Sequence, residues 1–80
     1  MSETVKNVLE KLREAGIPLK ESKVKPLYDF SISVGRGILE IDDQNSEYDT
    51  ENIPRKYLVK IEEVMKENRF TRKGIRIGAE

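Results

Sequence analysis

The chain contains no cysteine, no histidine and no tryptophan. Without cysteine it can form no disulfide, no thiolate nucleophile and no cysteine-ligated zinc site. Without histidine it lacks the commonest general base and the commonest metal ligand of proteins. Neither a Ser-His-Asp nor a Cys-His arrangement can therefore be assembled within this sequence. These absences predict a protein that is not an enzyme and that carries no cofactor.

Long apolar segments and an excess of one charge are also missing. No stretch approaches the roughly 20 consecutive apolar residues that cross a bilayer, and residues 1–11 mix charges without an apolar signal core. We therefore expect no secretion and a cytoplasmic location. Fifteen basic and 15 acidic residues give a net charge of zero, which argues against general binding of polyanions. Eighty residues, of which 36% are hydrophobic, predict a single small domain over residues 1–80 with a thin stability margin.

Residues 28–42 alternate between apolar and polar side chains, and the rest of the chain is organised around them. The apolar positions are Tyr28, Phe30, Ile32, Val34, Leu39 and Ile41. A period of two is typical of strands with one buried face. An even loop, Gly35-Arg36 or Arg36-Gly37, puts the apolar positions of both strands on one face, whereas a three-residue loop would turn Glu40 toward the core. We predict an antiparallel hairpin with an even loop and an outward Glu40.

Two segments have the periodicity of amphipathic helices. Residues 2–15 carry one apolar stripe, with Ser2 or Thr4 able to cap the first amides and Gly16 able to end the helix. Residues 53–69 carry a second apolar stripe, and Pro54 near the start of this segment fits the first turn of a helix. We expect Thr50 or Asn52 to cap this second helix.

The remaining segments contain fewer apolar residues. Residues 17–27 predict an extended connection with a short edge strand near Val24, and residues 42–52 predict a polar loop. The alternation of Ile75 and Ile77 favours a third strand added to the hairpin, and a frayed terminus is the alternative. The expected fold is a two-layer α+β domain, with an antiparallel hairpin and an optional C-terminal strand packed against two helices, in the order α-β-β-α-β.

Charge is distributed unevenly along the chain. All charged residues from Glu40 to Glu51 are acidic. An EF-hand loop beginning at Asp42 would need glycine at its sixth position and glutamate at its twelfth, and Glu47 and Ile53 stand there instead. A hydrophilic loop with solvated carboxylates explains the acidic run without a metal.

The C-terminal part contains the densest basic cluster, formed by Arg69, Arg72, Lys73 and Arg76. With Ile75 and Ile77 in the core, Arg72 and Arg76 would stand on the outer sheet face beside Ser31 and Ser33, where they could bind phosphates. That face lacks an aromatic stacking platform, and solvated charges that protect an edge strand are the competing interpretation. Arg36, between two glycines, could contact a phosphate or simply occupy a hairpin turn.

Ile38 falls on the polar side of the hairpin in the even-loop register. An exposed isoleucine beside an edge strand indicates a contact with another chain, although single exposed apolar residues are also normal. The sequence therefore predicts a small non-enzymatic intracellular regulatory protein that binds another protein or a second copy of itself. Nucleic-acid binding is the alternative, and neither a membrane nor a small-molecule substrate is indicated. The candidate partner-binding residues are Arg36, Ile38, Arg69, Arg72, Lys73 and Arg76.

Overall fold

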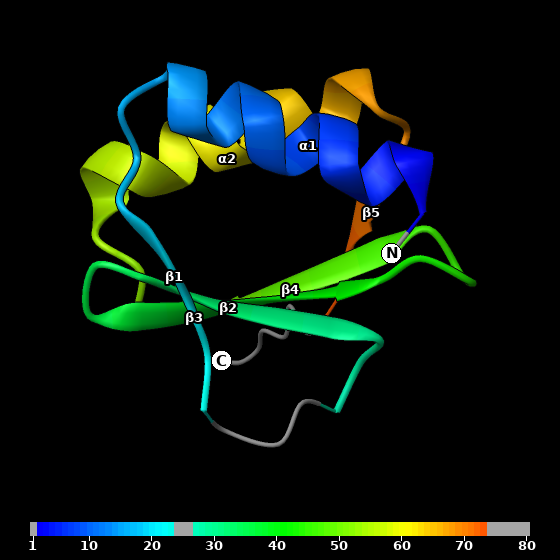
Figure 1. Cartoon of the computed structure of the whole chain (residues 1–80), viewed down its shortest axis with the longest axis horizontal. Helices are drawn as coiled ribbons and strands as arrows, with labels where there is room; N and C mark the ends of the chain where they lie inside the picture. The colour runs from blue at the N-terminus through cyan, green and yellow to red at the C-terminus, as the bar shows by residue number, and fades with distance from the viewer. Residues whose placement is uncertain (1, 24–26, 74–80) are drawn as a thin grey trace.

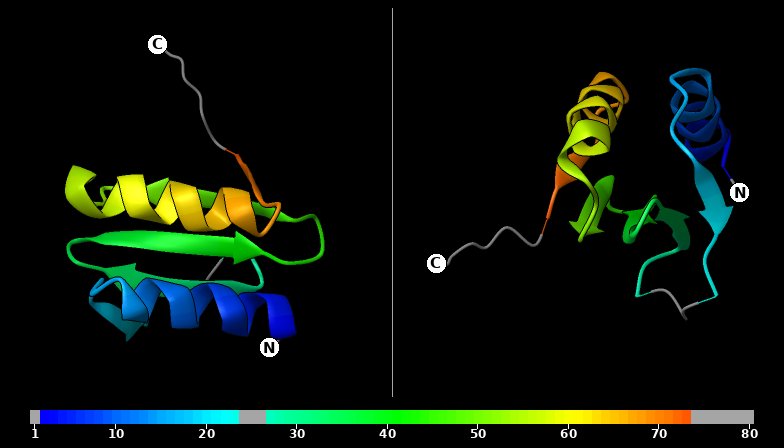
Figure 2. Two further views of the ribbon diagram at one scale, coloured as in Figure 1. Left: turned by 90° about the horizontal axis from the view of Figure 1, so that it is seen from above. Right: turned by 90° about the vertical axis from the view of Figure 1, so that its left-hand side faces the viewer.

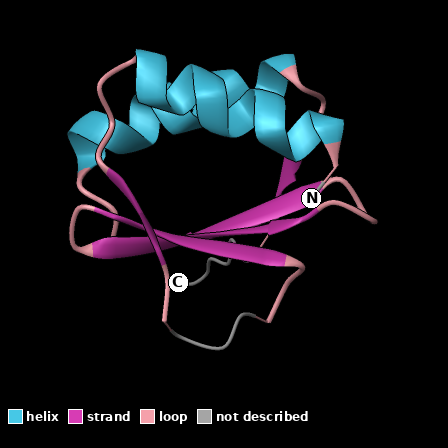
Figure 3. Ribbon diagram, in the orientation of Figure 1, coloured by secondary structure: helices cyan, strands magenta, loops and turns pink. Residues whose placement is uncertain are grey.

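A computed structural model of the chain describes residues 2–23 and 27–73, and it has two helices packed on one side of a five-stranded sheet (Figures 1 and 3). The strands lie in the order β1-β2-β3-β4-β5; neighbours are antiparallel except for β4 and β5, which are parallel. The elements are α1 (Glu3–Glu14), β1 (Leu19–Glu21), β2 (Phe30–Val34), β3 (Gly37–Asp42), β4 (Glu47–Glu51), α2 (Arg55–Glu67) and β5 (Thr71–Arg72). The predicted two-layer α+β class is confirmed, but the described order is α-β-β-β-β-α-β rather than α-β-β-α-β.

The hairpin forms as the alternation predicts. Val34 pairs with Gly37, so the loop consists of the two residues Gly35 and Arg36, and Gly35 has a φ of 60°. Leu39 is fully buried under the helices, whereas Glu40 points to the other side of the sheet. The even loop and the outward Glu40 are therefore confirmed.

The first helix also agrees with its prediction. The Ser2 hydroxyl accepts a hydrogen bond from the Val5 amide at 3.1 Å and caps the helix start. Gly16 follows the helix end with a φ of 82°, a left-handed conformation that costs glycine little. The apolar stripe packs onto the sheet through Val5, Val8, Leu9 and Leu12.

The second helix begins later than the sequence suggested. It starts at Arg55, with Pro54 in the cap position and no side-chain hydrogen bond there, so the expected cap from Thr50 or Asn52 is wrong. The reason is local, because Thr50 lies within β4 and Asn52 occupies a left-handed turn with a φ of 57°. The helix buries Ile61, Val64 and Met65 and lies beside α1 (Figure 2).

The polar loop predicted over residues 42–52 is wrong, because residues 47–51 form the strand β4. Tyr48 pairs with Ile41 and is only 4% exposed. A single aromatic side chain is enough to fix the inward face, and pairing with β3 satisfies the backbone donors and acceptors of this polar segment. The acidic residues of β4 consequently belong to the sheet rather than to a loop.

Both edge strands differ from the predicted arrangement, in which one C-terminal strand is added to the hairpin. The N-terminal edge strand is Leu19–Glu21, which is antiparallel to β2. The C-terminal strand Thr71–Arg72 pairs in parallel with β4, not with the hairpin, because β4 already occupies the open edge of β3. The predicted positions near Val24, and those of Ile75 and Ile77, lie outside the described residues.

Neither helix of the described ranges combines the length and apolar character needed to cross a bilayer.

Candidate binding surfaces

The side of the sheet that faces away from the helices is an extended polar surface. Both helices lie above the same side of the sheet in Figure 2. We call the other side the open face; its residues on β2, β3 and β4 are Ser31, Ser33, Ile38, Glu40, Asp42, Glu47, Asp49 and Glu51. Carboxylates from β3 and β4 dominate it, so the acidic run forms one continuous surface on the sheet.

Strand register sets carboxylates directly against each other on the open face. Glu40 pairs with Asp49, and Asp42 pairs with Glu47. Side chains at directly opposed positions have their Cβ atoms about 4.5–5.5 Å apart, and like charges there are destabilising. Neither Glu40 nor Asp49 forms an ion pair with any described residue. Among the described residues, the centre of the open face therefore holds two opposed carboxylates without an ion-pair partner.

Hydrogen bonds from neutral donors orient these carboxylates. Asp42 accepts bonds from the side chain of Asn45 at 2.7 Å and from its amide at 3.1 Å, and the side-chain bond is the main cause of the lowered pKa of Asp42. Asp49 accepts a bond from the Thr50 amide at 2.8 Å. These donors hold the carboxylates in place without cancelling their charge.

Two lysines stand at the rims of the open face. Lys73 Nζ lies 3.3 Å from a carboxylate oxygen of Glu47, and this contact raises the pKa of Lys73. At the other rim the register pairs Lys20 with Ser33. Both cations lie outside the Glu40–Asp49 row, so the acidic centre lies between basic edges.

Tyr28 and Leu27 approach the open face from the connection before β2. The sequence alternation assigned Tyr28 to the buried side of a strand, which is wrong, since β2 begins only at Phe30. Partial burial raises the pKa of the Tyr28 phenol, and the Asp49 carboxylate raises it further, so the phenol lies within reach of the open-face charges. Leu27 is 88% exposed, and its amide donates a hydrogen bond to Glu40 at 3.0 Å.

Three uncharged side chains, Ser31, Ser33 and Ile38, complete the open face. Ile38 lies between Ser33 and Glu51 and is half-buried, so the outward position that the sequence predicted for it is confirmed. Ser31 is 8% exposed, and its hydroxyl has no hydrogen-bond partner among the described residues. The face thus offers apolar contact area beside its carboxylates, whereas the Ser31 hydroxyl is buried.

The basic residues singled out in the sequence do not gather on this face. Arg72 was expected there, and that placement is wrong: it pairs with Tyr48, and its guanidinium contacts Glu62 at 3.1 Å and Thr50 at 2.7 Å on the helix side. The register of β5 sets Arg72 beside the inward Tyr48, which places Arg72 on the helix side. Arg36 is exposed in the hairpin turn, and Arg69 is exposed after α2. Arg76 lies outside the described residues.

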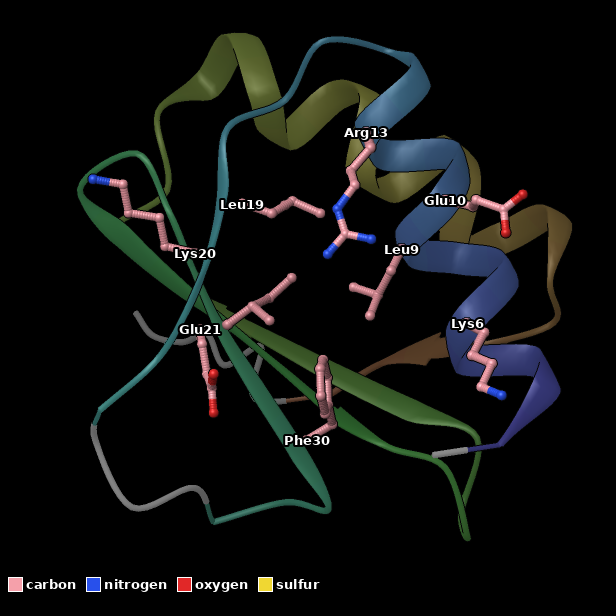
Figure 4. A pocket seen from close by; sticks show the side chains of 9 residues that line it. Lys6, Leu9, Glu10, Arg13, Leu19, Lys20, Glu21 and Phe30 are labelled. Carbon is pink, nitrogen blue, oxygen red and sulfur yellow. The ribbon is translucent and has the colours of Figure 1, made fainter.

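A groove between α1 and β1 is a second candidate surface, and the sequence did not indicate it. Its volume is about 460 Å³ (Figure 4). It is lined by Lys6, Leu9, Glu10, Arg13, Leu19, Lys20, Glu21, Phe30 and Ile32. Periodicity assigns α1 an apolar stripe and a polar side, but it does not fix the distance between the helix and an edge strand.

Within residues 2–23 and 27–73, no three acidic side chains converge in a way that could hold a metal ion. No family model, curated protein or solved structure is significantly similar to this chain.

Proposed function

We propose that this chain is a non-enzymatic binding protein whose open face recognises a basic surface of another protein. The observation that carries the proposal is the direct opposition of Glu40 and Asp49, neither of which forms an ion pair within residues 2–23 and 27–73. A stable sheet would gain from replacing either carboxylate, because like charges at opposed positions disfavour folding. A partner that brings lysine or arginine side chains to this row turns the same pair into an attractive feature.

Apolar contacts beside the carboxylates supply the other component of a protein interface. Ile38 lies on the open face, and Leu27 and Tyr28 approach it from the preceding connection. Interfaces are centred on apolar and aromatic residues, with polar groups that fix orientation and partner choice. The mixture of exposed leucine, a tyrosine and oriented carboxylates favours a protein partner with both basic and apolar side chains.

Nucleic acid fits the open face less well, because its phosphates would meet the same carboxylates. Two of the basic residues considered for such binding, Arg72 and Lys73, each contact a carboxylate of this chain, at 3.1 and 3.3 Å. Nucleic-acid binding through the remaining cations, Arg36, Arg69 and Arg76, is thus an alternative outcome of the experiment below, although Arg76 lies outside the described residues.

The experiment uses isotope-labelled protein and three probes: a lysine- and arginine-rich peptide with interspersed leucines, its glutamate-substituted counterpart, and duplex DNA and RNA. We expect amide shifts on β3 and β4 only with the basic peptide, and not with its glutamate-substituted counterpart or with DNA and RNA. The affinity for the basic peptide should fall as salt is raised from 50 to 300 mM. The variant Glu40→Gln/Asp49→Asn should weaken this binding. The matched control Glu3→Gln/Glu14→Gln removes the same charge at two exposed residues of α1 that do not line the groove, and it should leave the peptide binding unchanged.

Three results would contradict the proposal. One is an absence of binding to the basic peptide at 50 mM salt. Another is equal weakening by the open-face and α1 variants, which would indicate a non-specific effect of net charge. The third is binding of DNA or RNA with shifts around Arg36 and Arg69, which would establish the alternative.

A further inference from the structure

The groove between α1 and β1 lies on the helix side of the sheet, so it is separate from the open face. Its volume of about 460 Å³ falls in the range of roughly 300–1,000 Å³ that is usual for small-molecule sites. Its walls are α1 and the edge strand β1, and residues of β2 form its floor (Figure 4). A volume of this size suits a small molecule rather than a folded partner.

The inner surface of the groove is mainly apolar. Leu9 and Ile32 are core residues that also line it, and Leu19 and Phe30 are half-buried side chains packed against the core. Such a lining provides contact area for a hydrocarbon group, because removing apolar surface from water is favourable. The groove therefore selects for a ligand with an apolar part.

One charged side chain is directed into this space. In Figure 4 the guanidinium of Arg13 extends into the gap between α1 and β1, whereas the charged ends of Lys6 and Glu10 point away from it. Arg13 forms no ion pair with any described residue. A guanidinium presents a planar set of donors that matches a carboxylate, so an unpaired arginine beside an apolar wall suits a ligand that has both features.

We propose that this groove binds a small amphiphilic monocarboxylate, with its carboxylate on Arg13 and its alkyl chain along Leu9, Leu19 and Phe30. The charged residues that line the groove are three cations (Lys6, Arg13 and Lys20) and two carboxylates (Glu10 and Glu21), a net charge of +1. A ligand with one carboxylate matches this balance, whereas a polyphosphate or an anionic bilayer surface would bring more negative charge than the groove offsets. Lys20 borders both this groove and the rim of the open face, but the proposed ligand contacts, Arg13 and the apolar wall, lie on the helix side, so the site is independent of the function proposed above.

The first test is a calorimetric titration of the full chain with hexanoate, octanoate and decanoate below their micelle concentrations, with 1-octanol and octylammonium as charge controls. Each added methylene should strengthen binding by up to about fourfold until the groove is full. Octanoate should bind more tightly than octanol, and octylammonium should bind most weakly. Amide shifts should be confined to α1, β1 and the start of β2.

The second test compares Arg13→Gln with Lys11→Gln, an equal loss of charge on the same helix at an exposed residue that does not line the groove. Loss of the charge-assisted hydrogen bonds should weaken octanoate binding about tenfold or more in Arg13→Gln and leave octanol binding unchanged. Lys11→Gln should bind octanoate like the parent protein. Because both side chains are exposed, both variants should fold, and their thermal transitions verify this.

The proposal is overturned if octanoate and octanol bind equally, if the two variants bind octanoate alike, or if no carboxylate binds at millimolar concentration. A peptide with a C-terminal leucine forms a further arm of the titration. If that peptide binds the groove and alkyl carboxylates do not, the occupant is a peptide terminus and the small-molecule assignment fails.

Discussion

Replacing Asp49 by asparagine should stabilise the fold, although most substitutions destabilise proteins. The change keeps the size of the side chain and its acceptor oxygen for the Thr50 amide, which now lies 2.8 Å away. It removes the charge directly opposite Glu40. The expected gain therefore reports the electrostatic cost of this one pair.

The magnitude follows from Coulomb's law and the register. Two unit charges about 5 Å apart in water repel each other by about 0.8 kcal/mol, within the roughly 0.2–1 kcal/mol found for cross-strand pairs. Both carboxylates are half-buried and their ends can rotate apart, so a net gain of about 0.5 kcal/mol is reasonable. For a domain of this size, that corresponds to a rise in Tm of about 2–4 °C.

The assay is thermal and urea denaturation at pH 7 in 20 mM and 1 M salt. The gain should be largest at 20 mM and nearly vanish at 1 M, where the Debye length is only about 3 Å. Glu51→Gln is the matched control, because Glu51 lies on the same face but opposite the uncharged Ile38, so its effect on stability should be smaller than that of Asp49→Asn and should not depend on salt. The reasoning is refuted if Asp49→Asn is no more stable than the parent at low salt, or if its gain is independent of salt.

Leu39→Ala should lower the free energy of unfolding by about 2–5 kcal/mol, because Leu39 is fully buried. Leu27→Ala, at an 88% exposed position, should change this free energy by less than about 0.5 kcal/mol. Equal urea midpoints for the two variants would contradict the placement of the core. Gly37→Ala should lower the free energy of unfolding by about 1–3 kcal/mol, since the new Cβ would overlap the backbone at the end of β4. An unchanged Tm would contradict the close approach of that backbone to Gly37. The hydrogen bond from Asn45 lowers the pKa of Asp42, so this carboxylate stabilises the fold above its unfolded pKa, and the contribution is lost as pH falls through the lower folded value. An NMR titration should show that Asn45→Ala raises the pKa of Asp42, and an unchanged value would contradict the role of that bond.

The order of residues along the chain was enough to determine the parts of the fold that depend on local periodicity. The first helix and its terminal glycine can be derived from neighbouring residues, because a helix satisfies its own backbone, whereas the choice of Ser2 over Thr4 as the cap came from the structure. The hairpin could be derived for a similar reason: a period of two and a glycine-flanked turn fix which side chains share a face. The outward positions of Ile38 and Glu40 therefore followed from the sequence.

Other features required contacts between segments that are distant in sequence. The polar segment of residues 47–51 became a strand only because β3 offered it a pairing edge and the core had room for Tyr48. That pairing also decided which carboxylates oppose each other, since register between separate strands is not contained in the composition of either one. The register between β5 and β4 sets Arg72 beside the inward Tyr48 and so turns it toward the helices.

The groove that contains Arg13 depends on how far α1 lies from the edge strand. That distance is set by packing of the whole helix layer on the sheet and not by any motif. Local patterns therefore determined the faces of the individual elements, whereas tertiary packing decided which charges meet and where a cavity is left.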